Sequence, residues 1–150
     1  MKTVFDKETR DELIRRINTL NENSIALWGK MNVNQMMNHN TQWNYWVSAK
    51  EKNTQAFIGR LFGKIALKNI LKDESPLGRN TPTTPELRIE NLKKDIDFSA
   101  EKSKWIAQTE AYSHFSNEGF VHSFFGKMTN EQIGQLAYKH ADHHLRQFNS

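Results

Sequence analysis

Two histidines stand one helical turn apart on the apolar side of the last predicted helix. Residues 138–148 contain three of the six histidines in the chain. At about 100° per residue, His140 and His144 fall about 20° on either side of Ile133, in the middle of the apolar stripe. His143 falls at the edge of the stripe, and Asp142 falls on the opposite face and is expected to face water. Any fold of this chain must therefore accommodate two inward-pointing imidazoles.

These two side chains can share one metal ion. Residues four apart on a helix have side chains about 5–6 Å apart, which suits two imidazoles on one ion at about 2.0–2.1 Å. The alternative is a pair of core histidines hydrogen-bonded to the backbone or to each other. A zincin mechanism is excluded, because the position after His140 holds Ala141 instead of the glutamate base. A metal site needs a third ligand.

The composition limits what such a site can contain. With 150 residues, three prolines and no low-complexity tract, residues 1–150 are expected to form a single domain. The chain has no cysteine, so a metal must use histidine and oxygen donors. No run of eighteen apolar residues exists, and the first residues lack an apolar signal core, so we expect a cytoplasmic protein without membrane partners. The net charge of +4 and the lack of a recognised motif predict no nucleic-acid binding.

The second predicted helix supplies the third ligand. Asn32 and Gln35 resemble a capping box that opens a helix over residues 33–49. His39 lies there among methionines and tryptophans, on a face that is largely apolar. A stripe of this kind is usually plain core, yet a buried histidine needs a partner. An ion shared with His140 and His144 would be that partner.

The remaining segments complete an all-α prediction. A first helix spans residues 7–20, and Ser99 is expected to cap a helix over residues 100–117. Between them, a polar loop rich in proline and threonine covers residues 73–85, and Thr84 is expected to cap a short helix with Pro85 in its first turn. Thr129 and Gln132 are expected to form a capping box that opens the last helix. No strand pair is expected. The aromatic connector 120–127 contains His122, interpreted either as a proton shuttle or as a histidine with a structural hydrogen bond.

The helix predicted over residues 54–72 is basic and amphipathic. Four cations line one side, namely Arg60, Lys64, Lys68 and Lys72. Such a helix can lie on a membrane or bind an acidic partner, but the favoured interpretation is a bundle helix with a solvated lysine face. The sum is a four-helix bundle with short extra helices and the proline- and threonine-rich loop.

Several stretches resemble the DinB/YfiT-like superfamily, in a branch classed as a domain of unknown function. They are residues 28–39, 57–64, 80–83, 125–129 and 139–148. The resemblance implies a four-helix bundle that holds a divalent metal on His39, His140 and His144. Superfamily relatives include metal-dependent thiol S-transferases, a thiol-dependent isomerase and proteins with no known activity, and their frequent dimers imply a homodimer here.

Three neutral imidazoles leave an open coordination position, which is typical of a catalytic site. The leading hypothesis is a metal-dependent thiol S-transferase or hydrolase with a small-molecule substrate; any thiol must arrive as a low-molecular-weight cosubstrate. The candidate acid–base groups are His143 and His122, and Gln147 is a candidate hydrogen-bond partner of a ligand. Zinc or nickel is favoured, and iron or manganese is also compatible. The alternative is a non-catalytic dimeric scaffold with a structural metal or none, whose Lys64, Lys68 and Lys72 meet an acidic partner.

Overall fold

The computed structural model describes residues 1–49, 54–84, 87–117 and 119–150 of the chain, and these are mostly helical. Its α-helices are α1 (Lys7–Thr19), α2 (Val33–Ser48), α3 (Phe57–Ile70), α4 (Phe98–Ala111) and α5 (Asn130–Gln147). Two 3₁₀ turns, η2 (Ile89–Asn91) and η3 (Tyr112–His114), precede and follow α4. Two short strands, β1 (Val121–His122) and β2 (Gly126–Lys127), lie just before α5.

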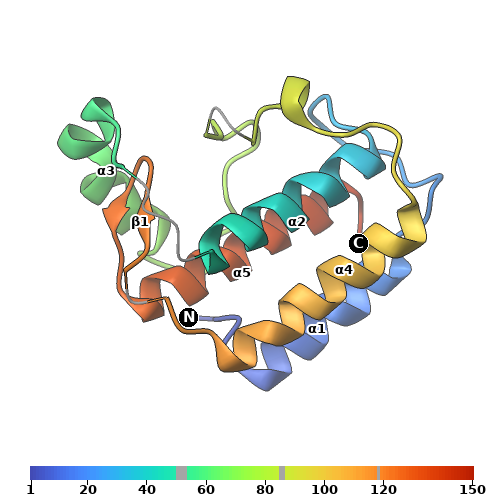
Figure 1. The fold of residues 1–150 in the computed structure, drawn as a ribbon, viewed down its shortest axis with the longest axis horizontal. Helices are drawn as coiled ribbons and strands as arrows, with labels where there is room; N and C mark the ends of the chain where they lie inside the picture. The colour runs from blue at the N-terminus through green and yellow to red at the C-terminus, as the bar shows by residue number, and fades with distance from the viewer. Residues whose placement is uncertain (50–53, 85–86, 118) are drawn as a thin grey trace.

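Four of the helices surround one core. Helix α2 packs on α4, α4 on α1, α1 on α5 and α5 on α2, which closes a ring of contacts (Figure 1). Each helix turns its apolar stripe inward, as an amphipathic sequence requires. The most deeply buried large side chains include Leu13, Ile17, Met36, Met37, Trp105, Ile133 and Leu145.

Both predicted capping boxes are present. The side chain of Asn32 accepts a hydrogen bond from the Gln35 amide at 2.8 Å, and that of Thr129 accepts one from the Gln132 amide at 3.2 Å. These bonds satisfy amides that the first turn of a helix leaves free. The Ser99 cap was wrong: Asp97 caps α4 by accepting from the Ala100 amide at 2.9 Å, and the helix ends at Ala111.

Helix α3 lies outside the ring, so the prediction of a bundle helix at this position was wrong. It packs on the β-hairpin, at one end of the molecule in Figure 1. The hairpin also corrects the expectation of no strand pair: Val121 pairs with Lys127 and His122 with Gly126 in antiparallel register. Gly126 has a φ of +76°, which suits glycine in this tight turn. The Pro85 position of the predicted short helix lies outside the described residues.

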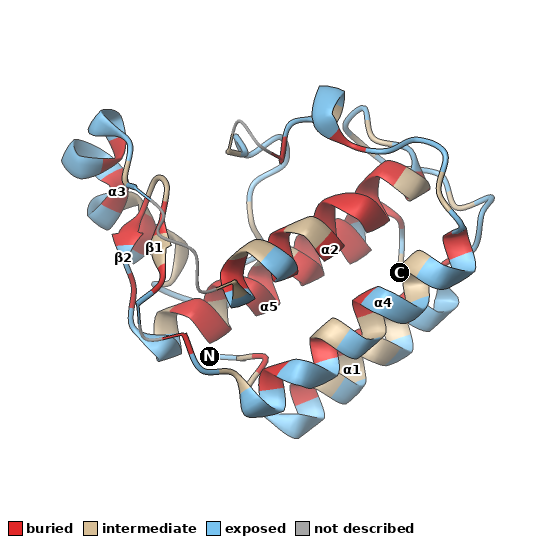
Figure 2. Ribbon diagram, in the orientation of Figure 1, coloured by how far each residue is buried: buried red, intermediate tan, exposed pale blue. Residues whose placement is uncertain are grey.

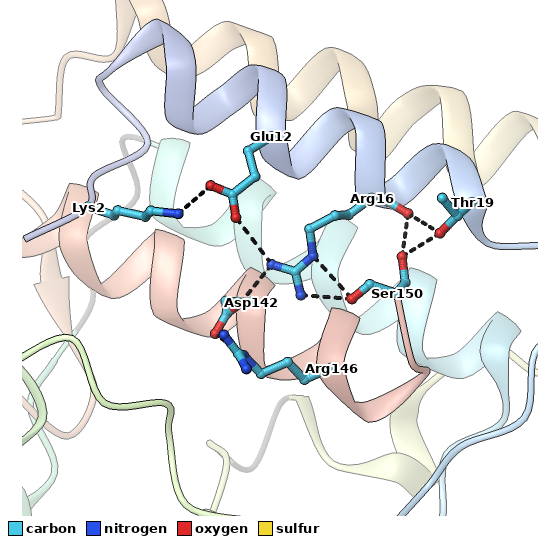
Figure 3. Close-up of polar contacts among 7 residues, drawn as sticks. All are labelled: Lys2, Glu12, Arg16, Thr19, Asp142, Arg146 and Ser150. Atoms are coloured by element: carbon cyan, nitrogen blue, oxygen red, sulfur yellow. Dashed lines mark hydrogen bonds and ion pairs between the residues drawn. The ribbon is translucent and has the colours of Figure 1, made fainter.

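The face of Asp142 was also predicted incorrectly, since its side chain is buried between α5 and α1. Arg16 Nη1 and Arg146 Nε each lie 2.7 Å from one of its carboxylate oxygens (Figure 3). Arg16 also donates from Nε to the backbone oxygen of Ser150 at 3.1 Å. The periodicity of one helix could not predict this burial, because the covering element, α1, is distant in sequence. The ion pair between Asp142 and Arg16 therefore connects α1 to α5, the helix that carries His140 and His144.

Burial is distributed unequally among the helices. Helices α2 and α5 are buried around most of their circumference, whereas α3 is largely exposed (Figure 2). In the part of the chain that the structure describes, no helix combines the length and apolar character needed to cross a bilayer. The buried pair α2 and α5 positions the site described next.

Candidate metal centre

Helices α2 and α5 bring the three predicted histidines together. One ring nitrogen from each of His39, His140 and His144 lies within 4.8 Å of the other two. The Nε2 atoms of His39 and His140 are 2.9 Å apart. Two nitrogens about 2.1 Å from one ion, at a right angle, would be about 3.0 Å apart. The nitrogens of His39 and His140 are therefore spaced like two ligands of one ion, and the group of three can hold a metal ion.

The tautomer of His39 follows from its backbone partner. Its Nδ1 lies 3.2 Å from the carbonyl oxygen of Leu87. A carbonyl can only accept, so Nδ1 carries the proton and donates it. The Nε2 atom of His39 is then left with a free lone pair that faces His140. This arrangement, in which one ring nitrogen is anchored and the other is free, is the usual one for a metal-binding histidine.

An amide side chain fixes His144 in the same way. The Oε1 atom of Gln147 lies 2.9 Å from Nδ1 of His144, while its Nε2 donates to the carbonyl of Trp28 at 2.8 Å. Since the Trp28 carbonyl can only accept, the Gln147 oxygen must face His144, whose Nδ1 is the donor. A Cβ at Gly29, where φ is +82°, would lie 2.6 Å from the Gln147 amide nitrogen. Glycine therefore allows the loop to approach this amide.

His140 is oriented by stacking. Its ring lies against the indole of Trp43, with centroids 4.6 Å apart and planes 19° from parallel. With its proton on Nδ1, the neutral His140 ring presents a lone pair at Nε2 that faces the lone pair on Nε2 of His39, 2.9 Å away. Binding of one metal ion by both nitrogens requires this tautomer.

Burial keeps these imidazoles neutral. It lowers the pKa of His39 to about 4. The pKa values of His140 and His144 lie well below the usual range, first because of burial and then because of neighbouring histidines. All three rings are therefore neutral near pH 7, and each has one nitrogen without a proton. A metal ion does not have to displace a proton from a cationic ring in order to bind.

The three histidines open onto a pocket of about 380 Å³. Its apolar walls include Met31, Leu77, Leu87 and Ile89, and its charged lining residues are Lys30, Arg88 and Glu90. Trp28 also lines the pocket, and its buried Nε1 has no acceptor among the described residues. A space of this size admits a small organic molecule beside the histidines.

The two candidate acid–base histidines occupy different places. His143 lines this pocket, with its ring edge-to-face against Trp28 at 5.7 Å, and burial lowers its pKa. His122 lies in the hairpin instead, where its Nδ1 accepts from the amides of Phe124 and Phe125 at 3.1 and 3.2 Å. These bonds fit the structural interpretation of His122; a catalytic role for either residue stays a prediction.

Sequence reasoning missed the contributions of Leu87 and Trp28. Both act on the histidines through backbone carbonyls, the first on His39 directly and the second through Gln147. A backbone acceptor leaves no signal in residue type, so only the fold could place them. Trp43 was recognised as part of the apolar stripe, but its stacking on His140 was not.

The fold and the site define a mostly helical protein with a buried group of three histidines able to bind a metal ion. The chain belongs to the family described as Protein of unknown function (DUF1569), whose sequence model matches residues 2–150. Comparison with curated proteins gave no match. Comparison with solved structures gave none either.

Proposed function

We propose that this protein is a metal-dependent enzyme of the thiol S-transferase or hydrolase type, built on a DinB/YfiT-like four-helix bundle. The observation that carries the proposal is the position of the three histidines, which converge on one point and also line a pocket. A closed structural site would use a fourth protein ligand. No Asp, Glu or further His joins the group within the described residues, so one position is left for substrate or water.

A divalent metal on these ligands would supply Lewis acidity, lowering the pKa of bound water or of a bound thiol. The chain holds the donors in place through the Leu87 carbonyl, the Gln147 amide and the Trp43 ring. Because the chain has no cysteine, a reacting thiol enters as a small cosubstrate. His143 is the proposed acid–base group, since it lines the same pocket. Zinc or nickel suits the all-imidazole donor set best, and the functional unit is proposed to be a cytoplasmic homodimer.

Metal content tests the first half of the proposal. We expect about one ion per chain in protein purified without chelators, and less than a tenth of that in His144→Ala. The matched control is His114→Ala, which removes an exposed histidine on η3. Elemental analysis with circular dichroism measures metal content and folding together. Equal metal content in the three proteins, all folded, would refute the metal site.

The partner of His144 allows a finer test. Gln147→Leu removes the acceptor at Nδ1 and is expected to weaken metal binding by about 10- to 100-fold, as loss of such partners does elsewhere. Gln135→Leu is the matched control on the same helix, because Gln135 is only partly buried and bonds only Glu131 among the described residues. Competition with a chelator of known affinity gives both dissociation constants. Unchanged affinity in Gln147→Leu would remove this residue from the site.

An open coordination position on the metal distinguishes an enzyme from a scaffold with a structural metal. In the cobalt-loaded protein, a small thiol should bind the metal and produce a thiolate-to-metal absorption band. A spectrum that stays unchanged at millimolar thiol would favour the closed, non-catalytic alternative.

A further inference from the structure

The outer face of α3 exposes five large apolar side chains in a row. Their exposed fractions are Phe57 76%, Ile58 59%, Leu61 57%, Phe62 55% and Ile65 62%. Together they present on the order of 600 Å² of apolar surface, at the upper end of what a monomer usually exposes in one patch. We name these five residues the α3 apolar face.

The packing of α3 forces this face outward. A Cβ at Gly59 or at Gly63 would lie closer than 3.0 Å to the carbonyl oxygen of Phe124, so only glycine fits against the hairpin there. Leu67, one turn further along the same side, is buried. Rotating the helix to hide the α3 apolar face would press larger side chains against the Phe124 backbone. The exposure of the α3 apolar face therefore follows from the packing of Gly59 and Gly63 against Phe124.

The charge of α3 indicates which kind of partner can cover the α3 apolar face. Residues 54–72 contain Arg60, Lys64, Lys68 and Lys72 and no acidic residue. Lys64 donates to the Lys127 carbonyl, and no carboxylate contacts Arg60 or Lys68 among the described residues. Pairing with α3 of a second copy would place two sets of cations side by side, which is unfavourable. A surface that is both apolar and anionic complements the helix.

We propose that α3 docks the protein on an anionic lipid surface. The α3 apolar face enters the boundary between headgroups and acyl chains, while Arg60 and Lys68 meet lipid phosphates. With 14 residues, α3 is too short to cross the bilayer and lies in its plane. It lies at one end of the molecule (Figure 1), and none of its residues lines the histidine pocket. The expectation that the chain has no membrane partner is the alternative to this proposal.

Vesicle sedimentation tests the proposal with the full chain. Wild-type protein should pellet with phosphatidylcholine vesicles that contain about 30% phosphatidylglycerol and stay in solution with phosphatidylcholine alone. The double variant Leu61→Ser/Phe62→Ser should bind about 30-fold more weakly or worse. Its matched control, Ile25→Ser/Leu27→Ser, removes two exposed apolar side chains elsewhere and should bind like wild type.

A second pair of variants tests how much the basic residues of α3 contribute to vesicle binding. Arg60→Gln/Lys68→Gln should bind about 30-fold more weakly, because each basic residue near the surface contributes roughly fivefold. Lys93→Gln/Lys94→Gln lowers the net charge equally at exposed positions outside α3 and should keep wild-type binding. Equal weakening in both variants would show a general charge effect and overturn the proposal.

A single label reports the orientation. Because the chain has no cysteine, Leu61→Cys and Lys93→Cys each accept one environment-sensitive fluorophore. Only the first should shift to the blue on anionic vesicles. No pelleting and no shift would overturn the proposal. Wild-type dimers that become monomers in Leu61→Ser/Phe62→Ser, without vesicle binding, would assign the face to a second copy instead, and binding of a polyacidic protein alone would assign it to a protein partner.

Discussion

Helices α2 and α3 reverse the usual relation between composition and burial. Helix α2 is rich in amide side chains and contains no Asp, Glu, Lys or Arg, yet its buried residues include Gln35, Asn38, Asn40, Thr41 and Asn44. Helix α3 is rich in phenylalanine, leucine and isoleucine, yet most of these side chains are exposed. The difference shows that burial depends on which elements surround a helix.

The buried amides of α2 are tolerated because they have partners. Asn40 donates to the Met36 carbonyl at 2.9 Å, and Asn44 accepts from the Tyr112 hydroxyl at 2.9 Å. A buried polar group without a partner would cost about 1–3 kcal/mol. The large apolar side chains of α3 stay exposed, because the hairpin packs on the opposite side of the helix, which carries Gly59 and Gly63. Three sets of variants test whether the surroundings of a side chain, and not its composition, decide how much it contributes to stability.

The largest effect is expected at a buried charged side chain, Asp142. Asp142→Ala removes the carboxylate nearest to Arg16, while that of Glu12 stays 3.8 Å away, and should lower the free energy of unfolding by about 3 kcal/mol. Urea denaturation at pH 7 measures the change. Asp11→Ala, which removes the exposed partner of Lys7, is the control and should cost less than about 0.5 kcal/mol. A cost below about 1 kcal/mol for Asp142→Ala would show that buried polar contacts do not stabilise this side of the molecule.

Protonation of a buried histidine is expected to have the next largest effect. Burial lowers the pKa of His122 to about 4 in the folded protein, below the usual 6.5. The unfolded chain therefore takes up the proton first, and stability that is complete above about pH 6.5 is lost as the pH falls towards 4. Between pH 7 and pH 5 this loss is about 2 kcal/mol.

A variant isolates that contribution. In His122→Asn the amide oxygen can still accept from Phe124 and Phe125, but the side chain no longer titrates. Denaturation curves at pH 7 and pH 5 should show a stability loss about 2 kcal/mol smaller than in wild type. The same pH dependence in both proteins would mean that His122 is accessible to protons in the folded state.

The smallest effect is expected on the α3 apolar face. Leu61→Ala should change the free energy of unfolding by less than about 0.5 kcal/mol, because the side chain is exposed. Leu67→Ala is the matched control on the same helix; it empties a buried site and should cost about 2 kcal/mol or more. Equal costs would show that Leu61 is covered in solution, which would contradict the exposed face.

Local signals predicted much of the fold. The capping boxes at Asn32 and Thr129 involve neighbouring residues, so the starts of α2 and α5 were read correctly from sequence. Helical periodicity also identified His39, His140 and His144 as candidate ligands, because it places each of them on the apolar face of its helix. The three rings do lie together.

Long-range contacts account for the errors. The burial of Asp142 depends on Arg16 in α1, and the position of α3 depends on the fit of Gly59 and Gly63 against Phe124. The spacing of these two glycines indicates a close approach but not whether the element that packs on them is a helix or a hairpin. Hairpin strands of two residues are too short to give an alternating pattern.

The single amide of Gln147 joins the loop at Trp28 to the ring of His144. Both Trp28 and His144 border the same pocket. A change in the position of this loop would move the amide, and with it the acceptor that orients the imidazole. The position of the loop that borders the pocket and the orientation of the His144 ring are therefore coupled.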